Sequence, residues 1–592
     1  MTTEPSIKES SRPSQAQIDE LRRNSRLAIP APLRIPLAST LSFVIGLGLG
    51  TTQGSKMTGL RFRAEHAHKL PTTTTGWFLY HKSKNYHVAF GGLREGLRMG
   101  TKICFWTTTM FSIEHMFDTY RGQTDLVNTV LACVSVAGGF SLWTSAELPP
   151  SDMKRPGPLA MLPLTTIIRS LVTTTISSSP LLLPPSLAIM TVLAHTTNPF
   201  LNPDRNPALK FILKKTFYAQ FCAGEQAAEV HHTIDSLKNI GFSGVILGYA
   251  KEVVLSEDQT KNLASCGQGA AAEECIRAEI SSWARGTMET VLLVAPGDFV
   301  ALKFTGAGRQ ALFDLAHRHP PTEALADAID SVCRLAAARG VRLLFDAEQQ
   351  AVQAGIDDWT LEYMRKYNTG GKAVVYGTYQ AYLKATPTTL AHHLAAALEE
   401  GFALGVKLVR GAYLGSDPRH VIHDTKADTD AAYDGITEAL LRRRWVWPFA
   451  EPTNNAGAVV LFPDVSLVLA SHNRTSVRKA CDILRGGRCE PGTEVSFAQL
   501  QGMADEVSCE LVSGSKAPAD VAAGDGAEAA LRRDQDLKAY KYLVWGSTGE
   551  CMKYLLRRAH ENREAVQRTR SGRDAMRVEL WRRVKSVFGI GA

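Results

Sequence analysis

The sequence of 592 residues predicts an α/β protein whose C-terminal part forms a (βα)₈ barrel, preceded by a helical N-terminal region that associates with a membrane. Eight short apolar runs recur after residue 240, stretches with helical spacing separate them, and polar residues follow most of the runs directly. Alternation of strands and helices indicates a parallel sheet, and eight such units suit a closed barrel. Because the length exceeds one ordinary domain, each part of the chain is considered separately.

Residues 1–36 form the first segment, which is polar, rich in serine and mixed in charge. No hydrophobic period runs through it, so we expect a disordered leader. Lys and Arg outnumber Asp and Glu before about residue 105, and the whole chain carries a net charge of +8. This excess suits an import signal or an anionic membrane surface, although Asp19 and Glu20 weaken the case for a mitochondrial signal.

Residues 37–146 are glycine-rich and contain three apolar stretches, each of which we expect to be too short or too interrupted for a spanning helix. The run from Gly92 to Phe140 resembles the mitochondrial inner-membrane import-translocase (Tim) family. The residues that carry the resemblance lie between two glycine-rich helices: Glu114, Asp118, Arg121, Gly122, Asp125 and Asn128. The resemblance implies a membrane region, and the alternative is a soluble helical hairpin.

The next two segments connect this region to the barrel. Residues 147–158 contain several prolines and charges and are expected to form a linker. Residues 159–240 are expected to form a helical arm that packs against the next domain, and the barrel is expected over 241–585. Two loop-like inserts are expected at 256–270 and 514–526.

Composition argues against several other classes of site. The 10 cysteines include no C-x-x-C pair and no Cys/His quartet, so neither a disulfide framework nor a metal site is indicated and a reducing compartment fits best. No run of five basic residues occurs, which argues against a nucleic-acid partner.

Polar residues gather where the predicted strands end. The eight apolar runs are 244–250, 299–305, 342–348, 373–379, 406–412, 467–473, 493–500 and 541–546. The polar residues at their carboxyl ends are Lys303, Asp346, Glu348, Tyr379, Gln380, Arg410, Tyr413, His472 and Asn473. Active sites of such barrels lie at this edge, and packing alone does not explain so many charged groups there.

The helix predicted after the last run places Tyr554, Arg557, Arg558 and Glu561 at intervals of three and four, hence on one face. Two guanidinium groups on one face can grip a small carboxylate through forked hydrogen bonds. The alternative is an ordinary solvated helix in which Glu561 is the partner of the arginines.

A series of motifs in fixed order resembles the proline dehydrogenase family, most of all its fungal mitochondrial members. The series is DAEQQ, TYQAYL, KLVRGAY, ASHN, FAQLQGM, YLVWG and LLRRAHEN, and the resemblance covers about residues 155 to 585. It implies a distorted (βα)₈ barrel that binds FAD and oxidises L-proline to 1-pyrroline-5-carboxylate, the first step of proline catabolism to glutamate. It also implies that electrons pass to a membrane quinone and that the barrel faces the matrix at the mitochondrial inner membrane.

The resemblance also implies the site residues. For the substrate these are Lys303, Asp346, Tyr413, Leu500, Tyr542, Tyr554, Arg557 and Arg558. For the flavin they are Tyr379, Gln380, Lys407, Val409, Arg410, Gly411, Ala412, Thr425, Lys426, His472, Asn473, Gln499 and Glu561. We expect Asp346 to order its Arg or Tyr neighbours and do not assign it as an obligatory base.

Departures from the family pattern leave two other hypotheses open. Bacterial members carry Arg at the position of Lys407 and Gln at that of Gly377, and the translocase-like N-terminal region is not a usual part of the family. One alternative is a membrane translocase component with an inactive barrel. The other is a barrel lyase that forms a Schiff base through Lys303 or Lys407.

Overall fold

The structure is a computed structural model that divides into two compact units, residues 1–150 and 151–592. It describes residues 26, 29–66, 71, 73–145, 157–179, 182–196, 198–250, 270–449, 461–486, 493–515, 537–561 and 566–587. Most of the expected leader, of the linker and of the two inserts therefore lies outside the described residues.

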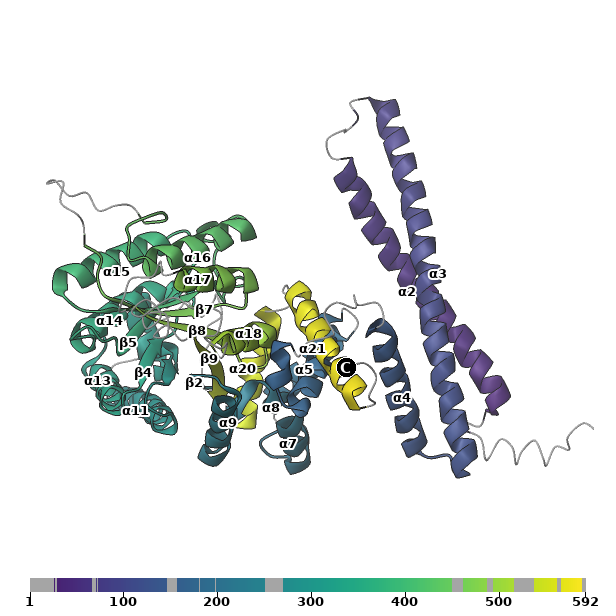
Figure 1. The fold of residues 1–592 in the computed structure, drawn as a ribbon, viewed down its shortest axis with the longest axis horizontal. Coiled ribbons are helices and arrows are strands. Elements are labelled where there is room, and N and C mark those ends of the chain that lie inside the picture. Colours follow the sequence, from purple (N-terminus) through teal and green to yellow (C-terminus); the bar gives the residue numbers. More distant parts are fainter. Residues whose placement is uncertain are drawn as a thin grey trace, which may run out of the picture. The chain divides into compact units, whose positions relative to one another are not determined.

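The N-terminal unit contains three helices: α2 (Ala31–Glu65), α3 (Thr74–Arg121) and α4 (Leu126–Ser145). Helices α2 and α3 form an antiparallel pair (Figure 1). A Cβ atom on Gly46 would lie 2.8 Å from the Cα of Gly100, and one on Gly50 would lie 2.8 Å from the Cα of Gly96. The two backbones therefore touch directly, a form of packing that small residues allow between membrane helices.

Helix α2 continues well beyond the apolar stretch that the sequence indicated. Among the described residues, the segment Ala31–Arg63 is long and apolar enough to cross a membrane, with a mean hydropathy of 1.5 in its best window. The expectation that each apolar stretch is too short or interrupted is therefore wrong for the first one. Beyond the apolar stretch the chain remains helical, and α3 packs closely against its glycines and threonines.

The charged residues of this unit pair with one another. The guanidinium group of Arg26 donates two hydrogen bonds of 2.7 Å to the carboxylate of Asp118 and lies 3.3 Å from Glu114. Arg34 lies 3.5 Å from the other carboxylate oxygen of Glu114, which is buried. Pairing of this kind lowers the cost of burying charge in either a membrane or a soluble bundle.

The second unit begins with a helical arm. Its elements are the 3₁₀ helix η3 (Pro158–Met161), α5 (Leu164–Ser178), α6 (Leu183–His195), α7 (Pro207–Leu213), the π-helical turn η4 (Lys214–Tyr218), α8 (Ala219–Phe221), β1 (Cys222–Gly224) and α9 (Ala227–Ile240). Ile167 of α5 packs in one apolar cluster with Met576, and Leu187 of α6 packs in another with Met552. The arm therefore covers the last two helices of the chain.

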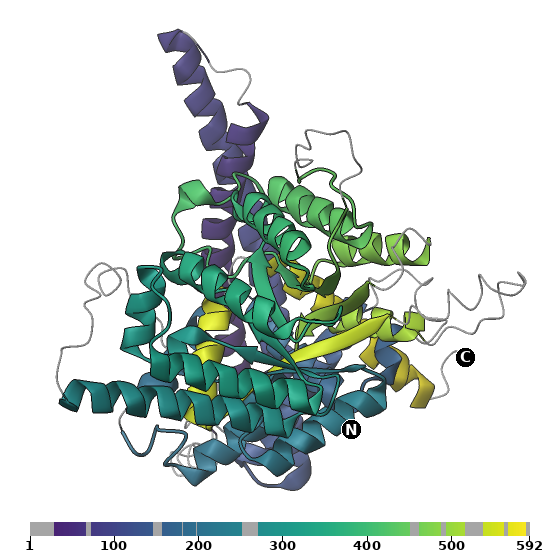
Figure 2. The same ribbon diagram turned by 90° about the vertical axis from the view of Figure 1, so that its left-hand side faces the viewer.

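Eight parallel strands close into a barrel (Figure 2): β2 (Gly244–Tyr249), β3 (Phe299–Leu302), β4 (Arg342–Phe345), β5 (Val375–Gln380), β6 (Leu404–Val409), β7 (Val465–Ala470), β8 (Glu494–Leu500) and β9 (Lys538–Trp545). Strand β9 pairs with both β8 and β2, which closes the sheet. The eight predicted runs are these strands, so the predicted barrel is confirmed. The short strand β1, which also pairs with β9, was not predicted.

Helices surround the barrel: α11 (Ala270–Leu293), α12 (Arg309–Ala316), α13 (Glu323–Arg339), α14 (Gln350–Tyr367), α15 (Thr386–Glu400), α16 (Lys426–Leu441), α17 (Arg474–Arg485), α18 (Asp505–Ser515) and α20 (Thr548–Glu561). The last helix, α21 (Val566–Val587), packs against α5 of the arm. Alternate strand residues face these helices and form the main core, while the others fill the barrel interior. This alternation decides which strand residues are able to reach the site.

The amino ends of the strands are closed by aromatic and charged side chains. The guanidinium group of Arg342 lies 3.8 Å from the ring centre of Phe299, donates to Tyr540 Oη at 3.1 Å and pairs with Glu494 at 2.6 Å. In the described part of the barrel, the amino ends of the strands therefore leave no room for a ligand, and we expect the active site at their carboxyl ends.

Candidate active site

Two buried polar side chains, Lys407 and Asp346, meet the half-buried Tyr542 at the carboxyl end of the barrel interior. Lys407 Nζ lies 2.5 Å from Asp346 Oδ1, and Tyr542 Oη donates to Asp346 Oδ2 at 3.0 Å. Burial, and then the negative charge of Asp346, raises the pKa of Tyr542, so its phenol remains protonated and donates. Both oxygens of Asp346 are thus engaged, which fits an ordering role better than that of a base. The ion pair with Asp346 engages the amino group of Lys407, which makes Lys407 a poor Schiff-base nucleophile.

Three cationic side chains converge on one aromatic ring. The charged groups of Lys303, Arg557 and Arg558 lie 5.9, 5.8 and 5.5 Å from the ring centre of Tyr554. Lys303 follows β3, whereas the two arginines belong to α20, so distant parts of the chain build this cluster. Tyr554 is buried. The cluster concentrates positive charge beside an apolar surface, which is what recognition of a small carboxylate requires.

A cavity of about 570 Å³ lies beside this cluster. The predicted residues that line it are Lys426, His472, Asn473, Leu500, Tyr542, Tyr554 and Arg558. Its other walls come from the helical arm, the start of α17, the segment 501–506, strand β9, α20 and α21, and are mostly apolar. The volume lies in the range of ligand-binding pockets.

Three other predicted substrate residues do not line the cavity, but they contact Tyr542 or Tyr554, which do. Asp346 hydrogen-bonds Tyr542, while Lys303 and Arg557 lie over Tyr554. The hydroxyl of Tyr413 donates to the carbonyl oxygen of Ala347, the residue after Asp346, at 3.4 Å.

The residues that follow β6 do not all face the barrel interior, where a segment that lines a flavin would face. Arg410 points toward helices α16 and α17, where it pairs with Asp430 and donates to Ser476 at 2.7 Å. Gly411 has φ +145°, and a Cβ atom there would lie 2.3 Å from the ring of Tyr382. The glycine is therefore required by the packing of Tyr382 as well as by its backbone conformation.

Two interior groups on β5 remain unsatisfied within the described part of the chain. Gln380 Oε1 accepts from the backbone N–H of Ala412 at 3.3 Å, but its buried Nε2 has no hydrogen-bond partner there. The hydroxyl of Thr378, one interior position earlier, is likewise buried without a partner. Orphaned donors of this kind need a ligand, and the carbonyl edge of a flavin supplies acceptors. Lys407 and Val409 lie on the neighbouring strand, so the residues present fit a flavin.

Four predicted residues stand at the amino ends of two helices. Thr425 caps α16 in a capping box with Asp428, and Asn473 caps α17. Lys426 Nζ pairs with Asp430 at 2.5 Å, and the backbone N–H of Leu500 donates to His472 Nε2 at 3.1 Å. Each residue has a local role, but the two helix ends adjoin the same cavity and favour an anionic group there.

Two predicted flavin residues point away from the barrel interior. The hydroxyl of Tyr379 lies 2.7 Å from Nδ1 of His393 on α15, in the core between strands and helices. Gln499 accepts from Ser508 of α18 at 3.0 Å and donates to a backbone oxygen at 3.3 Å. Because side chains alternate along a strand, these two residues do not join the cluster. The side chain of Glu561 lies outside the described residues.

Sequence reasoning missed several residues of the site. Thr378 lies within a predicted strand and gave no separate signal. The apolar cavity walls Phe217, Phe221 and Met552 come from helices whose packing direction the sequence does not define. The arginine pair was the signal that could have directed attention to the rest of α20.

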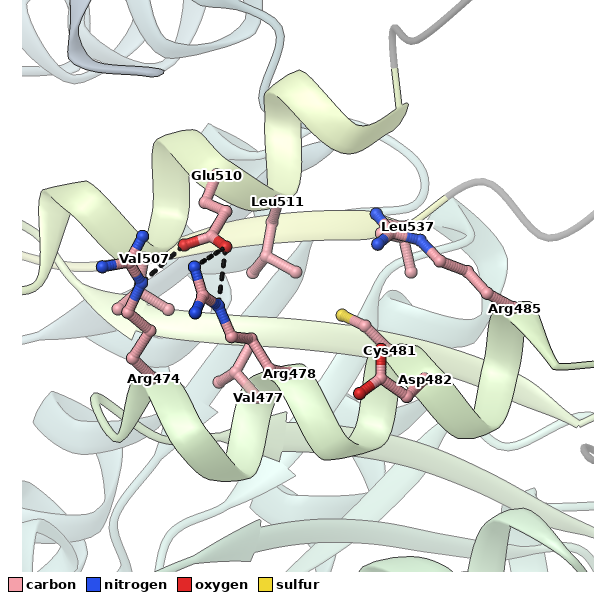
Figure 3. Close-up of a pocket in the computed structure, with 10 residues that line it drawn as sticks. All are labelled: Arg474, Val477, Arg478, Cys481, Asp482, Arg485, Val507, Glu510, Leu511 and Leu537. Carbon is pink, nitrogen blue, oxygen red and sulfur yellow. Dashed lines mark hydrogen bonds and ion pairs between the residues drawn. The ribbon is translucent and has the colours of Figure 1, made fainter. Parts of the chain in front are cut away.

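A smaller cavity of about 170 Å³ lies between α17 and α18 (Figure 3). Glu510 points into it between Arg474 and Arg478, and its carboxylate lies 2.7 Å from each guanidinium group. Arg485 lines the far end near Cys481. Only the large cavity combines barrel strand ends with the cationic cluster among the described residues, so we assign the site there.

The fold and the site define a (βα)₈-barrel enzyme whose active site lies at the carboxyl ends of the strands. The family model described as proline dehydrogenase matches residues 230–571. The chain therefore belongs to the proline dehydrogenase family and is an enzyme of that family.

Curated relatives carry matching names. The probable mitochondrial proline dehydrogenase of Schizosaccharomyces pombe is 28% identical over 409 residues, which are 62% of this chain and 80% of the relative. Mitochondrial proline dehydrogenase 1 of Caenorhabditis elegans is 33% identical over 260 residues, 43% of this chain and 37% of the relative. The hydroxyproline dehydrogenase of Bos taurus is 27% identical over 406 residues, 63% of this chain and 82% of the relative.

A solved structure, proline utilization A from Bdellovibrio bacteriovorus inactivated by N-propargylglycine, is 16% identical. The match covers 72% of this chain and 40% of that chain, with a TM-score of 0.45. The barrel assignment here rests on the strand pairings of this chain.

Proposed function

We propose that this enzyme uses FAD to oxidise L-proline to 1-pyrroline-5-carboxylate, the first step of proline catabolism to glutamate. One observation carries the proposal: Lys303, Arg557 and Arg558 surround the buried ring of Tyr554 at the edge of an apolar cavity. A small amino acid with an apolar ring fits this combination of charge and apolar wall.

The carboxylate of proline would pair with the two guanidinium groups, which fixes the ring in one orientation. The rings of Tyr542 and Tyr554 and the side chain of Leu500 would then flank the substrate ring and exclude longer substrates. The hydrogen bond from Tyr542 to Asp346 holds the ring of Tyr542 in place.

The cofactor would be held by groups on three sides of the barrel mouth. Gln380 and Lys407 would face the flavin ring, while Lys426, His472 and Asn473 at the ends of α16 and α17 would hold the phosphate and adenine parts. When bound, FAD supplies the acceptor for the hydride that leaves C5 of proline. Because Asp346 is engaged through both oxygens, proline must bind, or become, deprotonated at nitrogen without that carboxylate as base.

Flavin colour tests the proposal. The purified full-length chain should be yellow, and its flavin absorbance should bleach when L-proline is added under nitrogen. A flavin-containing protein that does not bleach with L-proline would overturn the assignment, as would a colourless protein that borohydride traps with substrate.

Hydroxyproline is a second candidate substrate, because relatives named hydroxyproline dehydrogenase match at 27% and 28% identity. We expect L-proline to bleach the flavin faster, because the phenol of Tyr542 already donates to Asp346 and Leu500 is apolar. Bleaching rates with L-proline and trans-4-hydroxyproline decide between the two.

We further propose that electrons pass to a membrane quinone, and that the barrel faces the matrix at the mitochondrial inner membrane. Five relatives are named mitochondrial, and α2 has the length and composition of a spanning helix. The Tim-like N-terminal unit would then be the anchor. Extraction of mitochondrial membranes with alkaline carbonate should leave the chain in the pellet. A translocase component with an inactive barrel would also pellet but would not bleach.

A further inference from the structure

Helix α5 lines the large cavity with hydroxyl-bearing and apolar residues, and exposes further apolar residues on its other side. Thr173 and Ile176 of α5 line the cavity, and in the same helix Ile168 and Val172 are exposed. Leu164 lies four residues before Ile168 and is exposed as well. These three residues form an exposed apolar stripe along one side of α5, which is the kind of patch that marks an interaction surface.

The neighbouring helices repeat this arrangement. In α6, Leu187 and Met190 line the cavity, whereas Val192 is exposed. Ile189 does both, since it lines the cavity and is 61% exposed. The apolar exterior is thus continuous with the cavity wall at Ile189.

The segment that follows adds large exposed apolar residues. Phe200 is 81% exposed, and Phe211 of α7 is 63% exposed beside Ile212. In the same part of the chain, Leu213 and Phe217 line the cavity. Helices α5 and α6 are bent by 107° relative to each other, a geometry that suits lying in a surface more than crossing it.

Charge distinguishes between possible partners of this surface. Residues 164–216 contain five Lys and Arg but only one acidic residue, Asp204. Two of the lysines pair with Glu225 and Glu229, while Arg205 and Lys215 are exposed among the aromatic residues. Apolar and aromatic side chains flanked by basic groups match the interface of an anionic lipid bilayer.

We propose that the outer face of α5, α6 and α7 docks on an anionic bilayer, with the cavity entrance at Ile189 facing the lipid. The proposal rests on the proposed function, to which it adds the place where a lipid-resident electron acceptor enters the site. An acceptor dissolved in lipid then reaches the cavity without crossing water.

Site-specific photo-crosslinking tests the docking directly. The photoreactive residue p-benzoylphenylalanine is introduced at Phe211 of the full-length chain, and at exposed Glu362 on barrel helix α14 as a control. Irradiation with vesicles of phosphatidylcholine and phosphatidylglycerol should give lipid adducts, read by mass spectrometry, at 211 and not at 362. Adducts to protein at 211, whether to a second copy or to the chain's own N-terminal helices, would overturn the proposal. So would no adduct, or equal lipid labelling at both positions.

A charge substitution provides the functional test. Phe211→Glu should slow reduction of a long-chain quinone held in vesicles by about tenfold, as expected when roughly one exposed aromatic contact with lipid is lost. Bleaching by L-proline and reduction of a water-soluble acceptor should not change. Equal loss with both acceptors would contradict the docking surface. Failure to bleach in the parent protein, with lipid adducts still formed at 211, would instead count against the proposed function alone.

Discussion

The two ends of the barrel interior carry related clusters that differ in what lies beyond them. Strands β4 and β9 contribute to both: Arg342 and Tyr540 at the amino end, Asp346 and Tyr542 at the carboxyl end. Each cluster joins a cation, a carboxylate and a tyrosine. At the amino end Phe299 covers the cation, whereas the carboxyl end adjoins the large cavity and the orphaned amide of Gln380. The same combination of side chains therefore closes one end of the barrel and lies beside the candidate site at the other.

The largest expected effect is on substrate binding at the carboxyl end. Arg557→Ala removes one of the two proposed carboxylate partners and should lower kcat/KM for L-proline about 10³-fold, mainly through KM. The flavin spectrum should be nearly unchanged. Steady-state kinetics measures the effect, and Lys553→Ala on the exposed side of the same helix serves as the matched control. Loss of flavin would mean that Arg557 has been assigned to the wrong ligand.

At the amino end the main expected effect is on stability. Arg342→Ala leaves Glu494 and Tyr540 without their shared partner and should reduce the free energy of unfolding by about 3 kcal/mol. Denaturant titration measures the loss. The kcat/KM of the folded fraction should remain near that of the parent, and a large fall there would show that the two ends are coupled.

Removing one tyrosine hydroxyl at each end tests whether the carboxyl end affects the reaction rate and the amino end affects stability. Tyr542→Phe keeps the ring but frees one oxygen of Asp346, and should slow flavin reduction about tenfold, equivalent to ~1.4 kcal/mol. Tyr540→Phe should cost a comparable amount of stability and leave the rate unchanged. Stopped-flow bleaching measures the rate of flavin reduction in both variants. Equal rates in the two would contradict the difference between the two ends.

The smallest effect concerns pH at the amino end. Burial opposes ionisation of Glu494, but the charges of Arg342 and Lys538 outweigh it and lower its pKa below the ordinary 4.5. A lowered pKa stabilises the fold above 4.5, and this contribution is lost as pH falls from 4.5 through the folded-state value. Glu494→Gln should therefore show a shallower fall of stability with pH in that window. Melting curves at graded pH test this, and parallel profiles would contradict it.

The barrel could be predicted from sequence because its strands are buried on both faces and appear as short apolar runs between helical stretches. Polar residues at the predicted strand ends also gave the candidates Lys303, Asp346 and His472, of which His472 lines the cavity. Register could not be predicted: Tyr379 and Gln380 are adjacent, yet one faces helix α15 and the other the interior. Gln499 likewise faces helix α18 rather than the interior.

The remaining misses concern parts of the site without a repeating pattern. Strand β1 has only three residues, too few for a period. Helices α5 and α6 carry exposed apolar residues as well as residues that line the cavity, so hydrophobicity alone does not tell which side lines the cavity. The length of α2 was underestimated because its contact with α3 is built from glycines, which carry no hydrophobic signal.

Closure of the barrel by β9 has a consequence for biosynthesis. Until residues 538–545 emerge, β2 and β8 both present open edges, and the arginines that follow on α20 do not yet exist. The nascent chain therefore acquires sheet continuity and the arginine pair of α20 almost together, after all the other barrel strands have been made. A ribosome that stalls shortly before this point releases a product that is both prone to aggregate and unable to engage an amino acid.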